Sequence, residues 1–437
     1  MRGKYTCTAR LPEQLPIQRS TSESLPAIRL PTFKILELYT PSQHTPSFLV
    51  LMAKLVQNEP FRTLYVCGKL AVVLAKVPLW TLLYSVGADR PRPSWNLKKT
   101  LAVNALREII ETPMETGDFR GRDPTKEVTP RHCGGARFIW IDKVPSELIT
   151  GEIKRFADAC GAESVRIPAY GFGRWGARTE IPLAHDGEKI LMHIHGGAFV
   201  MGTAHPEDIT SYIPRGFLEY GRPTFTRTLS IEYRLCASDP YPTKSPFPTA
   251  LIDGLAGYLY LTRTLGFKPQ NVFISGDSAG GNIAQSIVRY LRDHPELGMG
   301  APGGLILFSP WADPTGTHDG LPNGVAAENS RSDFVRPQTD TDSMGQYGLR
   351  SLLGKISLQD ARKNPYLAPA SLEMGPEIVR DMFSGFPPCY VVGGGGETLL
   401  DSIRTLQQRM ADGIPENLFV YDEVPDAIHD FIGFKKL

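Results

Sequence analysis

Short apolar runs separated by Gly- and Pro-containing turns recur along the chain from about residue 136 onward. Between these runs, apolar residues repeat every three or four positions, which is the spacing of amphipathic helices. Strands that alternate with helices predict a mainly parallel sheet covered on both faces, the α/β class. The runs that we interpret as strands are Phe138–Ile141, Ile190–Ile194, Thr228–Tyr233, Val272–Ser275, Gly304–Phe308, Tyr390–Val392 and Leu418–Tyr421.

The alternation breaks down between residues 313 and 386. A polar stretch that contains Gly and Pro comes first, and short helical pieces follow it. We interpret 313–386 as an insertion over the sheet, within a domain that spans residues 136–437.

The N-terminal part of the chain has a different pattern. Residues 1–45 are rich in Pro, Ser and Thr without a sustained period, so we expect a mobile tail there. Residues 46–135 form a second region that contains the strongly apolar stretch 61–88. Within it, Arg62, Lys69 and Lys76 recur every seven residues and therefore share one face of a helix. Pro78 is expected to kink or end that helix.

Three interpretations of residues 61–88 stay open at this point: an amphipathic helix at a membrane interface, a tilted transmembrane anchor, and a cap helix over the domain. A spanning helix needs about 20 apolar residues, and a lysine near the bilayer centre costs roughly 2.5–3.5 kcal/mol. With two lysines in the stretch, a peripheral contact is favoured over a span. The cationic residues Arg90, Arg92, Lys98 and Lys99 suit either an anionic lipid surface or a solvated linker.

Composition narrows the classes of partner. Lys and Arg total 47 against 46 Asp and Glu, a net charge of +1, with no long run of one sign. Binding to nucleic acid through its phosphates needs an excess of cationic residues, so we expect no nucleic-acid partner. The six cysteines lie far apart with no histidine at ligand spacing, and we expect neither a metal site nor a disulfide scaffold. The first 30 residues lack the apolar core of a cleaved export signal, so we expect an intracellular protein whose membrane contact, if any, is through 61–88.

A candidate nucleophile lies in Gly276-Asp-Ser-Ala-Gly280, the one G-x-S-x-G pattern of the sequence. The apolar run 272–275 precedes it, and an amphipathic pattern from Ile283 to Leu291 follows. A strand that turns sharply into a helix at such a motif is a nucleophile elbow, in which small residues on both sides let the serine hydroxyl protrude. Ser278 is therefore the predicted nucleophile, at a helix N-terminus that favours anionic intermediates.

The strand expected at 190–194 runs into His195-Gly-Gly-Ala-Phe199. Acyl transfer places negative charge on a former carbonyl oxygen, and backbone N–H groups without bulky side chains can approach that oxygen closely. We predict an oxyanion hole from the amides of Gly196, Gly197 and Ala198, together with that of Ala279. The methyl group of Ala198 leaves the donor in place unless the backbone there requires a positive φ. His195 is expected to brace this loop.

The general base and its acid follow the nucleophile in the chain order of this kind of triad. Of the histidines after Ser278, only His429 follows a late strand with room for an acid before it. The acid belongs in the loop after the strand expected at 390–392, where Glu397 comes first and Asp401 is the alternative. Either carboxylate could hold the imidazole in the required tautomer.

Over about residues 136–437 the sequence resembles the hormone-sensitive-lipase-like branch of the α/β-hydrolase superfamily. The segment 90–95, with the apolar helix before it, looks like the N-terminal region of fungal members of that branch, including steryl acetyl hydrolases. The matching motifs are His195–Phe199, Glu232–Leu235, Pro246–Pro248 with Asp253, Gly276–Asn282, Ser309–Trp311 and the loops of Glu397 and His429.

The resemblance implies an α/β-hydrolase fold with a helical cap built from the N-terminal segment and the mid-chain insertion. It also implies hydrolysis of short-chain or lipophilic esters without a metal or organic cofactor. The sequence departs from the family pattern at Ala198, where Gly is usual, at Glu397, where Asp is usual, and in extra residues at 236–244.

From these residues we expect a serine carboxylic-ester hydrolase that acts through an acyl-enzyme on a small lipophilic ester substrate, a short-chain (acetyl-like) ester of a lipophilic alcohol. Two alternatives stay open. Acyl transfer would use an alcohol in place of water at the second step of the same triad. A non-catalytic binding protein, like the plant gibberellin receptors on this scaffold, is disfavoured because those receptors lack the triad histidine that His429 supplies here.

Overall fold

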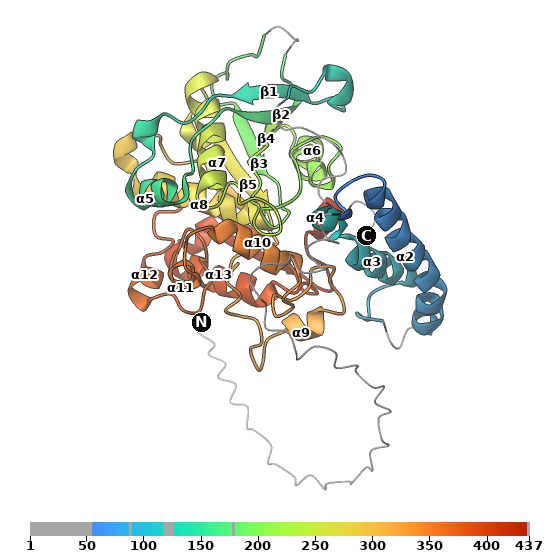
Figure 1. Ribbon diagram of the computed structural model, residues 1–437. Coiled ribbons are helices and arrows are strands. Elements are labelled where there is room, and N and C mark those ends of the chain that lie inside the picture. The colour runs from blue at the N-terminus through green and yellow to red at the C-terminus, as the bar shows by residue number, and fades with distance from the viewer. Residues whose placement is uncertain (1–54, 87–89, 117–125, 177–179, 435–437) are drawn as a thin grey trace, which may run out of the picture. The chain divides into compact units, whose positions relative to one another are not determined.

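In the C-terminal two-thirds of the chain, the strands form one sheet, and helices cover both faces of that sheet (Figure 1). The computed structural model describes residues 55–86, 90–116, 126–176 and 180–434. The chain divides into two units, Met1–Pro46 and Ser47–Leu437, and every described residue belongs to the second. The predicted tail, residues 1–45, lies outside the described residues.

Eight strands of the described residues form the sheet in the order β1-β2-β4-β3-β5-β6-β7-β8. β2 pairs antiparallel with β1 and β4, and every other pair is parallel, which confirms the predicted α/β class. The strands are β1 (Arg137–Ile141), β2 (Ile167–Gly173), β3 (Lys189–Ile194), β4 (Phe225–Ile231), β5 (Val272–Asp277), β6 (Gly304–Phe308), β7 (Cys389–Gly394) and β8 (Phe419–Val424).

One strand escaped the analysis of apolar runs. β2 contains Pro168 and two glycines, so its sequence shows no continuous apolar pattern. Its first six residues are nevertheless buried, because it lies between β1 and β4. Pairing on both sides therefore overrides a weak intrinsic strand propensity.

Alternate residues of the central strands face different helices. Leu307 and Val391 pack with α7, α8 and α13 on one face, whereas Phe308 and Val392 pack against Ile213 of α6 on the other. The helices are α2 (Phe61–Ser85), α3 (Leu97–Ile109), α4 (Thr112–Thr116), α5 (Gly151–Cys160), α6 (Tyr212–Tyr220), α7 (Thr249–Leu259), α8 (Ala279–Asp293), α9 (Ala326–Asn329), α10 (Met344–Leu353), α11 (Leu358–Arg362), α12 (Pro376–Arg380) and α13 (Leu400–Gly413).

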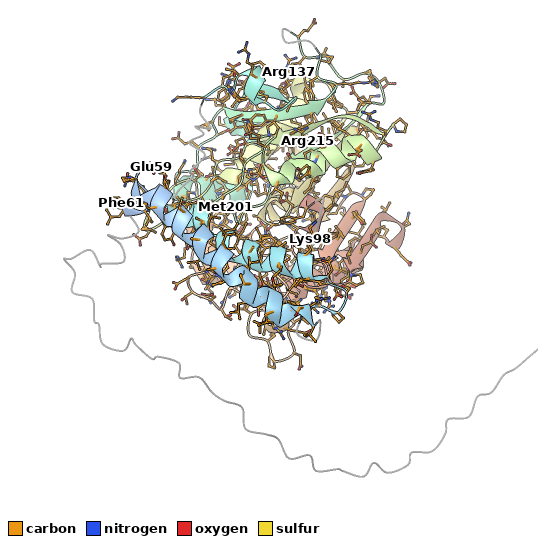
Figure 2. All side chains as sticks on the ribbon, turned by 90° about the vertical axis from the view of Figure 1, so that its right-hand side faces the viewer. Glu59, Phe61, Lys98, Arg137, Met201 and Arg215 are labelled. Carbon is orange, nitrogen blue, oxygen red and sulfur yellow. The ribbon has the colours of Figure 1, made fainter. Side chains whose placement is uncertain are left out.

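Three segments distant in sequence meet over the carboxyl ends of the strands. Trp95 and Val103 of the N-terminal region form an apolar cluster with Phe334 of the segment between β6 and β7 and with Ile428 of the loop after β8. The Trp95 indole also donates a hydrogen bond to the Asp426 carbonyl oxygen at 2.8 Å. The helices α2 and α3 lie side by side along this part of the molecule (Figures 1 and 2).

The apolar stretch expected at 61–88 forms α2, and this helix continues through Pro78 to Ser85 rather than ending at the proline. By length and composition α2 could cross a membrane, since an 18-residue window has a mean hydropathy of 1.7, although helices of other kinds pass the same criteria. Its lysines face the rest of the protein: Lys69 pairs with Glu115, and Lys76 contacts Glu108 at 2.7 Å.

Candidate active site

The turn between β5 and α8 holds Ser278 in a strained conformation at φ 49° and ψ −119°. Its N–H donates to the Phe308 carbonyl oxygen at 2.9 Å, and its own carbonyl oxygen accepts from Trp311 at 2.9 Å. The flanking glycines are required by space: a Cβ on Gly276 would lie 2.2 Å from the Gly280 oxygen, and one on Gly280 would lie 2.0 Å from the Ile194 oxygen. The turn is therefore the sharp strand-to-helix elbow expected at this motif.

The loops after β7 and β8 bring an imidazole against a carboxylate. Nδ1 of His429 lies 2.7 Å from Oε2 of Glu397, and both side chains are almost fully buried. The other oxygen of Glu397 accepts hydrogen bonds from the Ser309 hydroxyl at 3.1 Å and from the Gly394 amide. Asp401, the alternative acid, lies in the first turn of α13. Its carboxylate instead accepts a hydrogen bond from the Val325 amide at 2.8 Å.

Charge and burial act in opposite directions on this pair. Burial raises the pKa of Glu397, and its hydrogen bond to His429 offsets only part of that rise. For His429, burial lowers the pKa, but the facing carboxylates of Asp430 and Glu397 outweigh it and raise the pKa well above its ordinary value. A stabilised imidazolium is what a base that takes up a proton during catalysis needs.

The second ring nitrogen of His429 has a partner that sequence reasoning did not name. Nε2 lies 3.2 Å from Oδ2 of Asp430, the next residue in the chain. Within the described part of the chain, no hydrogen bond joins His429 to Ser278, although both line the same cavity. Apart from the position of Asp430 beside the predicted base, no sequence pattern indicates this residue.

Asp333, in the segment between β6 and β7, is a further residue that the sequence motifs did not indicate. One of its carboxylate oxygens accepts from the His429 backbone N–H at 3.2 Å, and the other accepts from the Thr398 N–H at 2.8 Å. Both neighbouring loops are thereby tied to one buried side chain. Because such a tie depends on chain segments far apart in sequence, no local pattern could have revealed it.

The four expected oxyanion donors differ in their surroundings. The Gly196 amide, expected to be one of them, donates to Oδ2 of Asp277 at 2.9 Å and is therefore already occupied. Among the described residues, the amides of Gly197 and Ala198 donate to no protein acceptor. The Ala279 amide is the first of α8, a position that has no partner within a helix. Three donors thus remain beside Ser278.

The loop that carries these donors is strained at the position where the sequence departs from glycine. Ala198 has φ 52°, in the left-handed region that an alanine enters at a cost of roughly 1–2 kcal/mol. Because φ is positive at this position, the methyl group of Ala198 adds strain that a glycine would not have. His195 braces the loop as expected: its ring stacks on Tyr233 with centroids 4.3 Å apart, and its Nδ1 lies 2.8 Å from the Gly196 oxygen.

A cavity of about 490 Å³ extends from the elbow to the N-terminal helices. Ser278 and His429 lie at one part of its wall, and Leu70 of α2 with Ile110 after α3 lie at another. Most of its lining is apolar, with further contributions from Ile213, Trp311, Phe334, Met344, Leu399 and Phe434. The N-terminal region therefore supplies part of the wall, which the periodicity of residues 61–88 alone did not reveal.

Residues 191–433, more than half of the chain, match the family profile of the alpha/beta hydrolase fold. The chain belongs to this family. Among the curated relatives of this alpha/beta hydrolase, an esterase of Acinetobacter venetianus is 29% identical over 233 residues, which cover 53% of this chain and 64% of the relative. An acetyl-hydrolase of Streptomyces hygroscopicus is 27% identical over 332 residues, 74% of this chain and 87% of the relative.

A fungal relative is also similar to this alpha/beta hydrolase. Steryl acetyl hydrolase 1 of Saccharomyces cerevisiae is 34% identical over 136 residues, which cover 30% of this chain and 29% of that protein. A solved esterase from the bacterial hormone-sensitive lipase family is 20% identical, with coverage of 83% of this chain and 90% of that one and a TM-score of 0.46. The family profile and the curated esterase and acetyl-hydrolase relatives bear out the predicted resemblance to esterases of the α/β-hydrolase superfamily.

Proposed function

We propose that this protein is a serine carboxylic-ester hydrolase that acts on acetyl-like esters of a lipophilic alcohol, with Ser278, His429 and Glu397 as its triad. The family and the esterase and acetyl-hydrolase names of its relatives support the reaction class. One observation carries the assignment of residues: an imidazole held at Nδ1 by a buried carboxylate lines the same cavity as a serine on a nucleophile elbow.

In the first half of the reaction, Nε2 of His429 takes the Ser278 proton as the oxygen attacks the ester carbonyl carbon. The amides of Gly197, Ala198 and Ala279 hold the negative charge on the former carbonyl oxygen. Collapse of the tetrahedral intermediate breaks the bond to the alcohol oxygen, which receives the proton from His429. The acyl group stays on Ser278.

In the second half, water gives a proton to His429 and attacks the acyl carbon. Release of the carboxylic acid then returns the proton to Ser278. Glu397 keeps the imidazole in the tautomer with Nδ1 protonated throughout both halves.

The substrate part of the proposal rests on the cavity. Its predominantly apolar wall favours an alcohol with a large apolar surface, because each buried CH₂ group contributes about 0.8 kcal/mol. The name of the fungal relative makes sterol acetates a reasonable first panel, with terpenoid acetates beside them.

The test compares the natural protein with Ser278→Ala on p-nitrophenyl acetate, followed by an acyl-chain series and a panel of acetylated sterols and terpenoids. We expect the variant to lose turnover by at least about 1000-fold. A phosphonate ester should label the natural protein and not the variant, which mass spectrometry detects. Undiminished activity in the variant would contradict the assignment of Ser278. Adding an alcohol acceptor distinguishes hydrolysis from acyl transfer through the products formed.

We further propose that α2 contacts a membrane peripherally, so that a dissolved ester reaches the cavity from the lipid phase. The lysines of α2 are paired with glutamates on the protein side, which leaves an apolar surface outside. Leu74 and Leu82 are 70% and 72% exposed there, and such an unpartnered apolar face is typical of interfacial helices. Leu70 of the same helix lines the cavity that holds Ser278.

Vesicle flotation with mixed phosphatidylcholine and phosphatidylserine tests this contact. We expect the double variant Leu74→Glu/Leu82→Glu to float less than the natural protein and to lose activity on vesicle-dissolved acetates while keeping activity on p-nitrophenyl acetate. Leu183→Glu is the matched control, since Leu183 is 69% exposed in a loop before β3. Equal loss on both substrates, or equal flotation, would contradict the proposal.

A further inference from the structure

The catalytic imidazole proposed above lies between two carboxylates rather than between a carboxylate and the serine. Glu397 lies 2.7 Å from Nδ1, and Asp430 lies 3.2 Å from Nε2. In the proposed reaction, Nε2 is the atom that must accept the Ser278 proton. Asp430 therefore occupies, in this arrangement, the side of the ring that the reaction requires.

The backbone holds Asp430 in this position. Its φ of 49° and ψ of 31° place it in the left-handed region, which turns the chain immediately after His429. Its N–H donates to the Ser309 hydroxyl oxygen at 3.2 Å, and the same hydroxyl donates to Glu397. Hydrogen bonds through the Ser309 hydroxyl therefore link the backbone of Asp430 to Glu397 and restrict the movement of Asp430.

The side chain of Asp430 is itself poorly satisfied. Its Oδ1 is buried and has no hydrogen-bond partner among the described residues, and only 17% of the side chain is exposed. Asp430 lines the cavity together with Asp277 and Ser278. Burying a carboxylate with one unpaired oxygen costs free energy. A contact between the other oxygen and a positively charged imidazolium offsets part of that cost and is therefore favoured.

We propose that Asp430 is a positioning residue that competes with Ser278 for Nε2 of His429 and thereby sets the pH range in which the enzyme is active. When the ring is protonated, its Nε2–H is donated to Asp430, and the ring cannot act as a base. Loss of that proton removes the attraction, and Nε2 becomes free to accept from Ser278. The inference rests on the proposed function, because it assigns His429 as the base.

The carboxylates around the His429 ring favour its protonated form. Glu397 faces Nδ1 from the loop after β7, Asp333 of the insertion accepts from the His429 backbone N–H, and Asp277 at the end of β5 acts on Asp430. Burial raises the pKa of Asp430 to about 7, and the nearby carboxylates of Asp277 and Glu397 add to that rise while His429 opposes it.

The experiment measures kcat/KM for p-nitrophenyl acetate against pH in the natural protein, Asp430→Asn and Asp430→Gly. Both replacements tolerate a left-handed backbone, so at least one is expected to fold as judged by thermal unfolding. An opposite charge within hydrogen-bonding range typically shifts a titration by about one to three pH units. We therefore expect the acid limb of the profile to move to lower pH by about one unit or more.

A second readout does not depend on turnover. The ring C–H signals of His429, followed by NMR in protein with labelled histidine, should titrate at lower pH in both Asp430 variants. Asp426→Asn is the matched control, because Asp426 lies in the same loop but contacts Ser94 rather than the imidazole. An acid limb and a histidine titration that stay in place in a folded Asp430 variant, or that move equally in Asp426→Asn, would overturn the inference. Since the NMR titration needs no catalysis, it separates failure of this inference from failure of the proposed esterase activity.

Discussion

Replacing Glu397 by glutamine removes a charge while keeping the size of the side chain. The Ser309 hydroxyl and the Gly394 amide donate to Oε1 and would continue to donate to the glutamine oxygen. That arrangement directs the glutamine NH₂ group toward Nδ1 of His429, where Oε2 now lies. Two donors cannot face each other, so the ring would carry its proton on Nε2 and could no longer accept one from Ser278.

The magnitude follows from the geometry. Unit charges 2.7 Å apart at an effective dielectric constant of 20 interact with about 6 kcal/mol. Loss of the orienting carboxylate in a serine triad typically costs about 10⁴-fold in kcat, or about 5.4 kcal/mol of transition-state stabilisation. These two figures agree, and we expect Glu397→Gln to lower kcat on p-nitrophenyl acetate by about 10⁴-fold.

Asp401→Asn is the matched control for this experiment. Asp401 is the alternative acid four residues further on, and its carboxylate accepts from the Val325 amide at the start of α13. We expect its kcat to change by less than about threefold, with a loss of unfolding free energy of about 0.5–2 kcal/mol, because the hydrogen bond from the Val325 amide and the negative charge in the first turn of α13 are weakened. The reasoning is refuted if Glu397→Gln keeps a tenth or more of the natural kcat, or if Asp401→Asn loses activity to the same extent.

Three further predictions concern the backbone strain at Ala198, the hydrogen bonds of Asp333, and the pH dependence of stability that Asp313 causes. Ala198→Gly should relieve the positive φ while keeping the amide, so we expect kcat within about threefold and a melting temperature that is unchanged or higher. Asp333→Ala leaves the buried His429, Thr398 and Phe334 N–H groups unpaired, and urea unfolding should show a loss of about 3–9 kcal/mol, at 1–3 kcal/mol for each group. Burial raises the pKa of Asp313, but hydrogen bonds from His318 and two threonines outweigh it and lower the pKa. Its stabilisation is therefore complete above the ordinary Asp pKa of about 3.9 and is lost as pH falls further, so Asp313→Asn should flatten the decline of unfolding free energy below about pH 4.

The strand-and-helix order was predictable because it depends on local periodicity. Alternating apolar runs identified the strands of the parallel part of the sheet, and the G-x-S-x-G turn identified the elbow at Ser278, where only glycine fits two positions before and two positions after the serine. β2 was missed because Pro168 and its glycines hide the pattern that pairing with two neighbours imposes.

The details of the site depended on contacts that no local pattern encodes. The sequence ranked Glu397 above Asp401 by position alone, and the 2.7 Å contact with His429 is what distinguishes them in space. The Gly196 amide was expected to be free, yet Asp277 takes its hydrogen bond. Asp430 was passed over, although it faces the ring nitrogen that the proposed reaction uses.

Local patterns in the chain were enough to predict the class of the fold and the strand-to-helix turn at Ser278, because backbone sterics and apolar spacing act over a few neighbouring residues. Which distant groups meet became known from the folded arrangement alone: α2 and α3 at the cavity wall, Asp333 beneath two loops, and Asp430 against the imidazole. Hydrogen bonds and charge pairs between distant segments act over a few ångströms of space, and distance along the chain carries almost no information about them.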